Sequence, residues 1–235
     1  KSFFTLFQFS LPFFICSLFY FFINLFDRVG LLFLLDESAL YITSLAVISK
    51  ISFFILFIII IFRQIWIPIS VKLFKSKNDK LISDLINIFL LFSLISIFFI
   101  SMMSKFIINL LVNDNYEIIT GVLPLISFQH VAFGLSSITA ISILTSKISR
   151  SMVWIYFISA SVNILLIFLL VPNFNIYGTA IASFISNLIW VILLSYSSQK
   201  YLHLKYDLKI ISFVLMSYFI FTYYFMFDIK NYFVL

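Results

Sequence analysis

A lysine inside an apolar run is the residue whose position suggests chemistry most directly. Lys50 lies nine residues into a segment, 41–62, that is otherwise uncharged, so in a helix it lies about 14 Å from the start of that segment. A lysine at the centre of a bilayer costs about 2.5 to 3.5 kcal/mol, and we expect its ammonium to face a watery or anionic interior. A cation there could bind a phosphate group. The alternative is a structural pairing with a carboxylate.

Polar side chains in the first apolar segment follow helical spacing. Ser17, Asn24 and Arg28 are separated by seven and four residues, and Asp27 lies beside Arg28. Residues with this spacing share one face of a helix. Two later segments show the same spacing, in Ser127, His130, Gly134 and Ser137, and in Tyr156, Ser159 and Asn163.

Together these stripes predict an aqueous cavity inside a helix bundle. The members that could bind a polar substrate carry a charge, an amide or an imidazole, and they are Lys50, Arg28, Asp27, Asn24, His130 and Asn163. The alternative is that the Ser and Gly positions only join helices, through hydrogen bonds worth about 0.6 kcal/mol each. A neutral His130 can also bond inside a bundle without titrating.

The sequence offers little for catalysis. It has two histidines, with no His-x-x-x-His or Glu-His pair, no two carboxylates within one apolar segment, and no Gly-x-x-x-x-Gly-Lys loop. Metal-assisted hydrolysis, two-carboxylate chemistry and nucleotide hydrolysis each need one of these patterns. We therefore expect a transporter rather than an enzyme, with no catalytic residue, no metal and no cofactor. Cys16, the single cysteine, is interpreted as a small buried residue.

Composition indicates which elements position these residues. The 235 residues are 63% hydrophobic and 10% charged, whereas an average soluble domain has about 25% charged residues. The apolar runs are too long for the strands of about 10 residues that form membrane barrels. We therefore predict an all-α polytopic transmembrane helix bundle, in a single domain covering residues 1–235. The seven predicted spans are 3–26, 41–62, 85–103, 119–145, 152–171, 177–196 and 210–227.

Basic residues predict the orientation of these spans. Of the 15 Lys and Arg, eleven lie before, after or between spans on one side, three on the other, and Lys50 within a span. By the positive-inside rule the first side is cytoplasmic, and this dispersed charge accounts for the net +6 without a nucleic-acid partner. The longest and most basic loop is predicted at residues 63–84. It is interpreted either as an interfacial amphipathic segment or as a topology-setting loop with snorkelling lysines.

Residues 161–186 predict a helical hairpin. Pro172 removes a backbone donor, and Asn173 and Asn175 favour a turn. The second helix then begins with Gly178, Ala182 and Ser186 at four-residue spacing. Such a stripe of small residues lets two helix backbones approach closely in lipid.

The hairpin also resembles a signature that recurs in bacterial polysaccharide exporters. The matching residues are Asn163, Pro172, Gly178, Ala180 and Ala182. The first span is similar to the helix that begins the second half of the O-antigen flippases in the same superfamily, through Ser10, Leu11, Pro12, Asn24, Asp27 and Arg28. With further matches around Lys50 and at residues 116–124, the resemblance covers about residues 8–195 in the family's order.

This resemblance implies the C-terminal part of a flippase of the multidrug/oligosaccharidyl-lipid/polysaccharide export superfamily, in the bacterial inner membrane. Its substrate would be an undecaprenyl-diphosphate-linked oligosaccharide repeat unit for O-antigen or capsular polysaccharide. Its partners, besides the lipid bilayer, would be a polysaccharide polymerase and a chain-length regulator. Lys50 and Arg28 would compensate the diphosphate charge. Because the chain begins at Lys1 and enters an apolar span almost at once, we expect a fragment of a longer protein.

Two other functions remain open at this point. A cation-coupled multidrug exporter of the same fold would favour a buried carboxylate, and Asp27 is the one acidic residue near a span face. A membrane-embedded sugar polymerase or acyltransferase would need a large external loop, whereas the longest external loops predicted here have only about 15 residues.

Overall fold

The computed structural model describes residues 2–36, 38–75, 79–111, 118–139, 150–199 and 207–232, and in these ranges the chain is helical almost throughout. Six of its helices are long and apolar enough to cross a membrane. The prediction of an all-α, multi-pass helix bundle is therefore confirmed. The helices are α1 (Ser2–Leu34), α2 (Ser38–Lys75), α3 (Asp79–Leu111), α4 (Leu123–Thr139), α6 (Arg150–Gln199) and α7 (Leu208–Tyr232), and a short 3-10 helix, η1 (Thr120–Val122), precedes α4.

The helix α6 is two helices joined by a sharp reversal. Asn175 has φ 51° and ψ −131°, far from helical values. Across the reversal, the Ser159 hydroxyl donates to the Ser186 carbonyl at 2.7 Å. A Cβ on Gly178 would lie 2.6 Å from the Leu170 carbonyl carbon and oxygen, so the two backbones touch at the corner. The predicted hairpin is therefore confirmed, and α6 consists of two arms that meet at Asn175.

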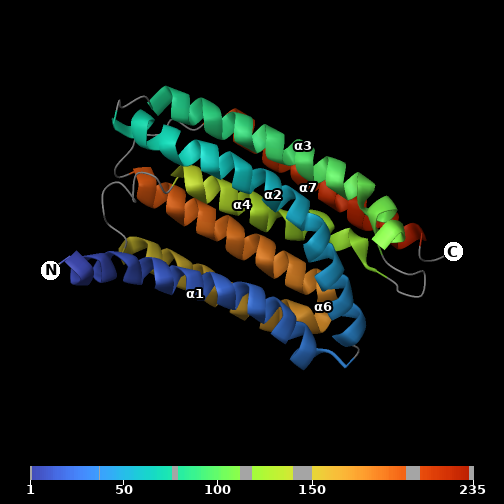
Figure 1. The fold of residues 1–235 in the computed structure, drawn as a ribbon. Helices are drawn as coiled ribbons and strands as arrows, with labels where there is room; N and C mark the ends of the chain where they lie inside the picture. Colours follow the sequence, from blue (N-terminus) through green and yellow to red (C-terminus); the bar gives the residue numbers. More distant parts are fainter. Residues whose placement is uncertain are drawn as a thin grey trace.

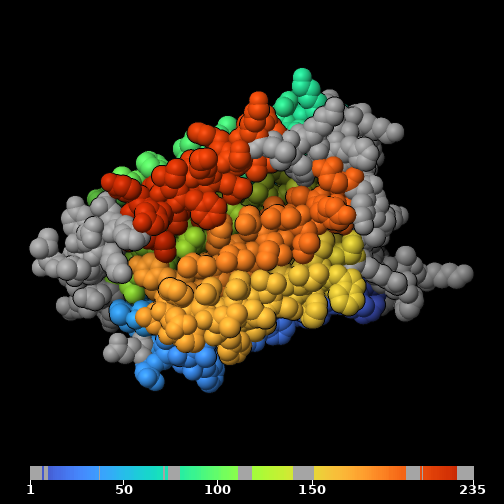
Figure 2. Space-filling view, turned by 180° about the vertical axis from the view of Figure 1, so that it is seen from behind, coloured from blue at the N-terminus to red at the C-terminus, as the bar shows by residue number. Residues whose placement is uncertain are grey.

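The arms of α6 run side by side, and α1 packs along them. Figure 2 shows the first arm in yellow and the second in orange, with the red α7 on the far side of the second arm. The helix α4 lies inside the bundle and packs against α2, α3 and α6. All of its residues except Gln129 and Phe133 are buried. It therefore forms the core on which the other helices are arranged.

The ends of the helices alternate between two ends of the bundle (Figure 1). The start of α1, the end of α2, the start of α3, the end of α4, both termini of α6 and the start of α7 lie at one end of the bundle. The end of α1, the start of α2, the corner of α6 and the end of α7 lie at the other end. This is the alternation expected for seven spans. The first of these is called the basic end below, because the helix termini there carry Lys72, Lys75, Lys80, Arg150 and Lys209; its cytoplasmic placement stays a prediction.

The prediction of a loop at residues 63–84 is wrong over most of that range. The helix α2 continues to Lys75 and α3 begins at Asp79. Trp66 is only 2% exposed, and its indole N–H donates to the Ser137 carbonyl at 3.2 Å. The buried stripe of the helix continues beyond the predicted span, and Trp66 is buried inside the bundle.

Candidate functional site

A cavity of about 480 Å³ lies between α1, α2, α4 and the second arm of α6. Its walls include apolar side chains such as Phe21, Leu25 and Phe53, which are partly exposed, so the cavity is open at its side. Its polar lining residues are Ser17, Tyr20, Asn24, Asp27, Arg28, Ser49, Gln129, His130, Thr179 and Ser183. A cavity with this lining could hold a polar or charged group between the apolar helices, within the part of the bundle that would cross the membrane.

Four of the residues predicted from the sequence come together here. Asn24, Asp27 and Arg28 line the cavity from α1, and His130 lines it from α4. Asn163 does not line the cavity, but its side-chain amide lies within hydrogen-bond distance of the Asp27 carboxylate. The predicted polar stripes of α1 and α4 thus meet at one cavity.

The structure places Lys50 elsewhere. It is exposed on α2 and is not among the described residues that line the cavity. Its neighbour Ser49 does line the cavity, and successive residues of a helix point about 100° apart. Lys50 is followed on the outer face of α2 by the exposed rings of Phe54 and Phe57. Its predicted contact with a phosphate therefore stays a prediction without support from this geometry.

The carboxylate of Asp27 is held by hydrogen bonds from both arms of α6. The Ser183 hydroxyl lies 2.7 Å from each carboxylate oxygen, and the Asn163 amide nitrogen lies 3.4 Å from Oδ1. Asn163 also lies 3.3 Å from the Ser186 hydroxyl. Asp27 is only 8% exposed. Because a buried carboxylate is costly without such partners, this cluster explains how α1 carries an acid inside the bundle and fixes α1 against α6.

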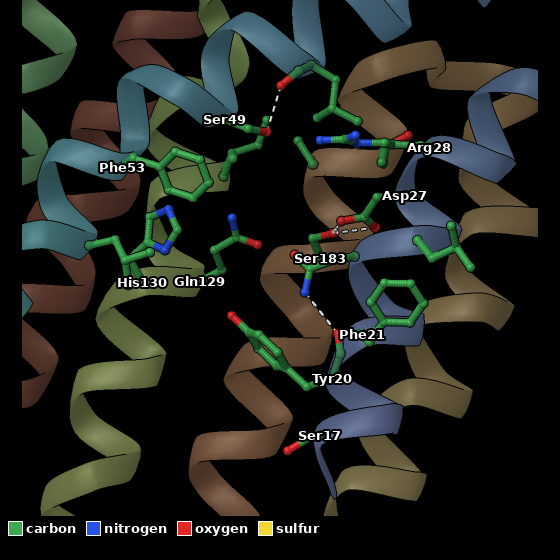
Figure 3. A pocket seen from close by; sticks show the side chains of 17 residues that line it. Ser17, Tyr20, Phe21, Asp27, Arg28, Ser49, Phe53, Gln129, His130 and Ser183 are labelled. Atoms are coloured by element: carbon green, nitrogen blue, oxygen red, sulfur yellow. Dashed lines mark hydrogen bonds between the residues drawn. The ribbon is translucent and has the colours of Figure 1, made fainter. Parts of the chain in front are cut away.

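Arg28 is turned the other way from the same helix. Figure 3 shows its side chain extending across the cavity toward Ser49, while the neighbouring Asp27 points toward Ser183. Arg28 is exposed, whereas Asp27 is buried. A guanidinium has five N–H donors and binds carboxylates and phosphates in a fixed geometry. Arg28 is therefore the cation of this cavity, among the residues described.

His130 joins α4 to α2 through one ring nitrogen. Its Nε2 lies 2.9 Å from the Ser52 hydroxyl, and that hydroxyl also lies 2.8 Å from the Ser49 carbonyl. The other nitrogen, Nδ1, is buried and has no partner among the described residues. His130 therefore lines the cavity while its bonded nitrogen fixes α4 against α2.

A layer of aromatic rings packs between the helices beside the cavity, toward the basic end of the described bundle. The Tyr20 ring, which lines the cavity, lies 6.1 Å from the ring centroids of both Phe133 and Trp190. Tyr156 lies 5.0 Å from Trp190, and the Arg63 guanidinium stacks on Phe133 at 4.0 Å. This aromatic layer joins α1, α2, α4 and both arms of α6. Sequence reasoning missed it, because among 33 Phe, 12 Tyr and 3 Trp nothing distinguishes the four aromatic residues of this layer.

Other members of the predicted stripes act within the bundle. Ser137 is buried and its hydroxyl donates to the Gly134 carbonyl of its own helix. Ser159 joins the two arms of α6. For these positions the alternative interpretation, that small polar residues hold helices together, fits the structure better. Among the described residues, no three His, Cys, Asp or Glu side chains come together as metal ligands.

Comparisons with protein families, with characterised proteins and with solved structures gave no match for this chain.

Proposed function

We propose that this chain is part of a membrane transporter that moves an undecaprenyl-diphosphate-linked oligosaccharide across the bacterial inner membrane. The observation that carries the proposal is Arg28, a guanidinium directed into a cavity between membrane-spanning helices that has both polar and apolar walls. A diphosphate needs a cation when it leaves water, and a guanidinium supplies paired donors for its oxygens. The sequence resemblance to polysaccharide flippases supports the same substrate class.

The rest of the cavity suits the sugar part of such a substrate. Asn24, Gln129 and Tyr20 bring amide and hydroxyl groups to its walls. The cavity opens at its side, so the lipid tail could remain in the bilayer while the head group enters. Transport would then require the aromatic layer to part, in the manner of alternating access.

The test compares two cations on neighbouring helices. Arg28→Gln removes the charge from the cavity, whereas Lys50→Gln removes a charge exposed on the outer face of α2. In a deletion strain complemented with the complete gene, we expect Arg28→Gln to abolish most surface polysaccharide and Lys50→Gln to preserve it. Output is normalised to the amount of protein in the membrane. Near-normal output from a well-expressed Arg28→Gln protein would contradict the proposed role of the cavity, and a larger loss in Lys50→Gln would restore Lys50 as the substrate contact.

A second candidate function is a cation-coupled multidrug exporter. It is favoured by Asp27, a carboxylate that lines the cavity and is shielded from solvent. In that case Asp27→Asn would abolish resistance to lipophilic cations, and loss of the protein would leave surface polysaccharide unchanged. The adjacent Arg28 opposes a cationic substrate, so the flippase is preferred. No observation favours a polymerase or an acyltransferase.

A further inference from the structure

A second cavity, of about 470 Å³, lies on the opposite face of α4 from the first. It is a groove between α3, α4, the second arm of α6 and α7. Figure 2 shows the hollow between the red α7 and the orange second arm of α6, with α4 visible at its base toward the basic end. The helix α7 packs on α3 and η1. The groove is therefore the space that α7 leaves beside α6.

The walls of this groove are almost entirely apolar, so they suit a hydrocarbon chain. None of the described residues that line it carries a charge. Four hydroxyl groups line it, and three of them are already bonded within the chain: the Ser93 hydroxyl donates to the Phe89 carbonyl, the Thr139 hydroxyl to the Leu135 carbonyl, and the Tyr218 hydroxyl to the Pro124 carbonyl. The fourth belongs to Ser195, near the basic end of the second arm of α6. A polar occupant would lose its hydration without finding partners here.

The groove is closed at the end away from the basic side. There the rings of Phe128, Phe184 and Tyr218 pack together, with centroids 4.6 to 5.7 Å apart. Along α7 the lining runs from Ile211 to Tyr218, and along α4 from Phe128 to Thr139, which correspond to about 10 and 16 Å of helix. Half of a bilayer core is about 15 Å thick. The groove is thus one leaflet deep and ends at the aromatic rings.

We propose that this groove holds one acyl chain of a bilayer phospholipid, inserted from the leaflet at the basic end. A partner helix would need a channel through the full membrane thickness, and a polyprenyl tail is much longer than one leaflet. Asp207 accepts from the backbone N–H of Lys209 and of Ile210 at the start of α7, so the helix begins at the open end of the groove, next to Ile211. This inference does not depend on the proposed function.

The enclosed position of α4 makes the proposal testable. Lipids around the bundle reach the outer face of α7, where Phe213 and Met216 are exposed, but Val131 and Leu135 of α4 are accessible only through the groove. The complete protein is reconstituted in vesicles of phosphatidylethanolamine and phosphatidylglycerol that contain a phospholipid with a diazirine in the middle of one acyl chain. After irradiation, labelled peptides are mapped by mass spectrometry. We expect label on α4 between residues 128 and 139 as well as on the outer face of α7.

Two substitutions on α7 separate occupancy of the groove from general lipid contact. Val214→Trp fills the groove and should remove the label from α4, whereas Ile220→Trp, on the outer face where Ile220 is 63% exposed, should leave it unchanged. Absence of label on α4 in the unaltered protein, with normal label on α7, would overturn the proposal. So would labelling of α4 by a diazirine polyprenyl phosphate but not by the phospholipid. The unaltered protein decides the question even if Val214→Trp fails to fold.

Discussion

The hydrogen bonds to Asp27 predict that Ser183 stabilises the bundle far more than its size suggests. Its hydroxyl lies 2.7 Å from both carboxylate oxygens, and the only other side chain bonded to the carboxylate in the described structure is Asn163, at a longer 3.4 Å. Ser183→Ala therefore leaves a buried acid with one weak donor. Ser96→Ala is the matched control, because Ser96 donates only to the Phe92 carbonyl of its own helix.

The expected loss of unfolding free energy follows from the type of hydrogen bond that is removed. A hydrogen bond to a charged group contributes about 1.5 to 3 kcal/mol, while interhelical bonds measured in a membrane protein reach about 1.7 kcal/mol. We expect Ser183→Ala to cost about 2 kcal/mol, which for a chain of this size corresponds to a fall in melting temperature of about 4 to 8 °C. The assay is thermal unfolding of the complete protein purified in detergent. Ser96→Ala should shift the melting temperature by about 2 °C or less.

A double-mutant cycle identifies the partner. Once Asp27 is replaced by Ala, removing the Ser183 hydroxyl should cost no more than the control, because residues in direct contact are not additive. The reasoning is refuted if Ser183→Ala behaves like Ser96→Ala in the unaltered protein. It is also refuted if the cost of Ser183→Ala is the same with and without the Asp27 carboxylate, since the hydroxyl would then act through another contact.

The remaining predictions concern packing and topology. Ala182 is fully buried, so Ala182→Leu should lower the melting temperature much more than Ile181→Leu, by overpacking that costs about 1 to 3 kcal/mol; equal stability of the two variants would contradict close packing of this arm. On a Cys16→Ala background, Asn173→Cys should react with an impermeant maleimide in intact spheroplasts, and Lys77→Cys only after the membrane is opened. Labelling of Lys77→Cys from outside would reverse the assigned orientation.

Local patterns in the sequence were sufficient to predict the α6 hairpin. A proline, two asparagines and Gly178 fall within a few residues at the end of an uncharged run, and each acts on the backbone next to it. The reversal does occur at Asn175, and Gly178 contacts the backbone of Leu170. The polar face of α1 was also predictable, because the spacing of Asn24, Asp27 and Arg28 fixes their relative directions on a helix whatever surrounds it.

The end of α2 could not be predicted in the same way. Arg63 was taken to mark the end of a span, because a charge normally ends an apolar segment. In the structure its guanidinium stacks on Phe133 of α4, and Trp66 in the next turn donates to Ser137 of the same helix. Both contacts join residues about 70 positions apart. No pattern within α2 indicates that such partners exist.

The direction of a charge is a tertiary property as well, and Asp27 and Arg28 show why it matters for function. They are adjacent on α1, so helix geometry turns them about 100° apart, but it does not show which partners each of them meets. In the structure the Asp27 carboxylate accepts hydrogen bonds from Ser183 and Asn163 of α6, so it is already bonded within the protein. The guanidinium of Arg28, directed into the cavity, keeps its donors for a ligand. An anionic group that enters this cavity therefore meets a cation whose neighbouring acid is held away from it by the second arm of α6.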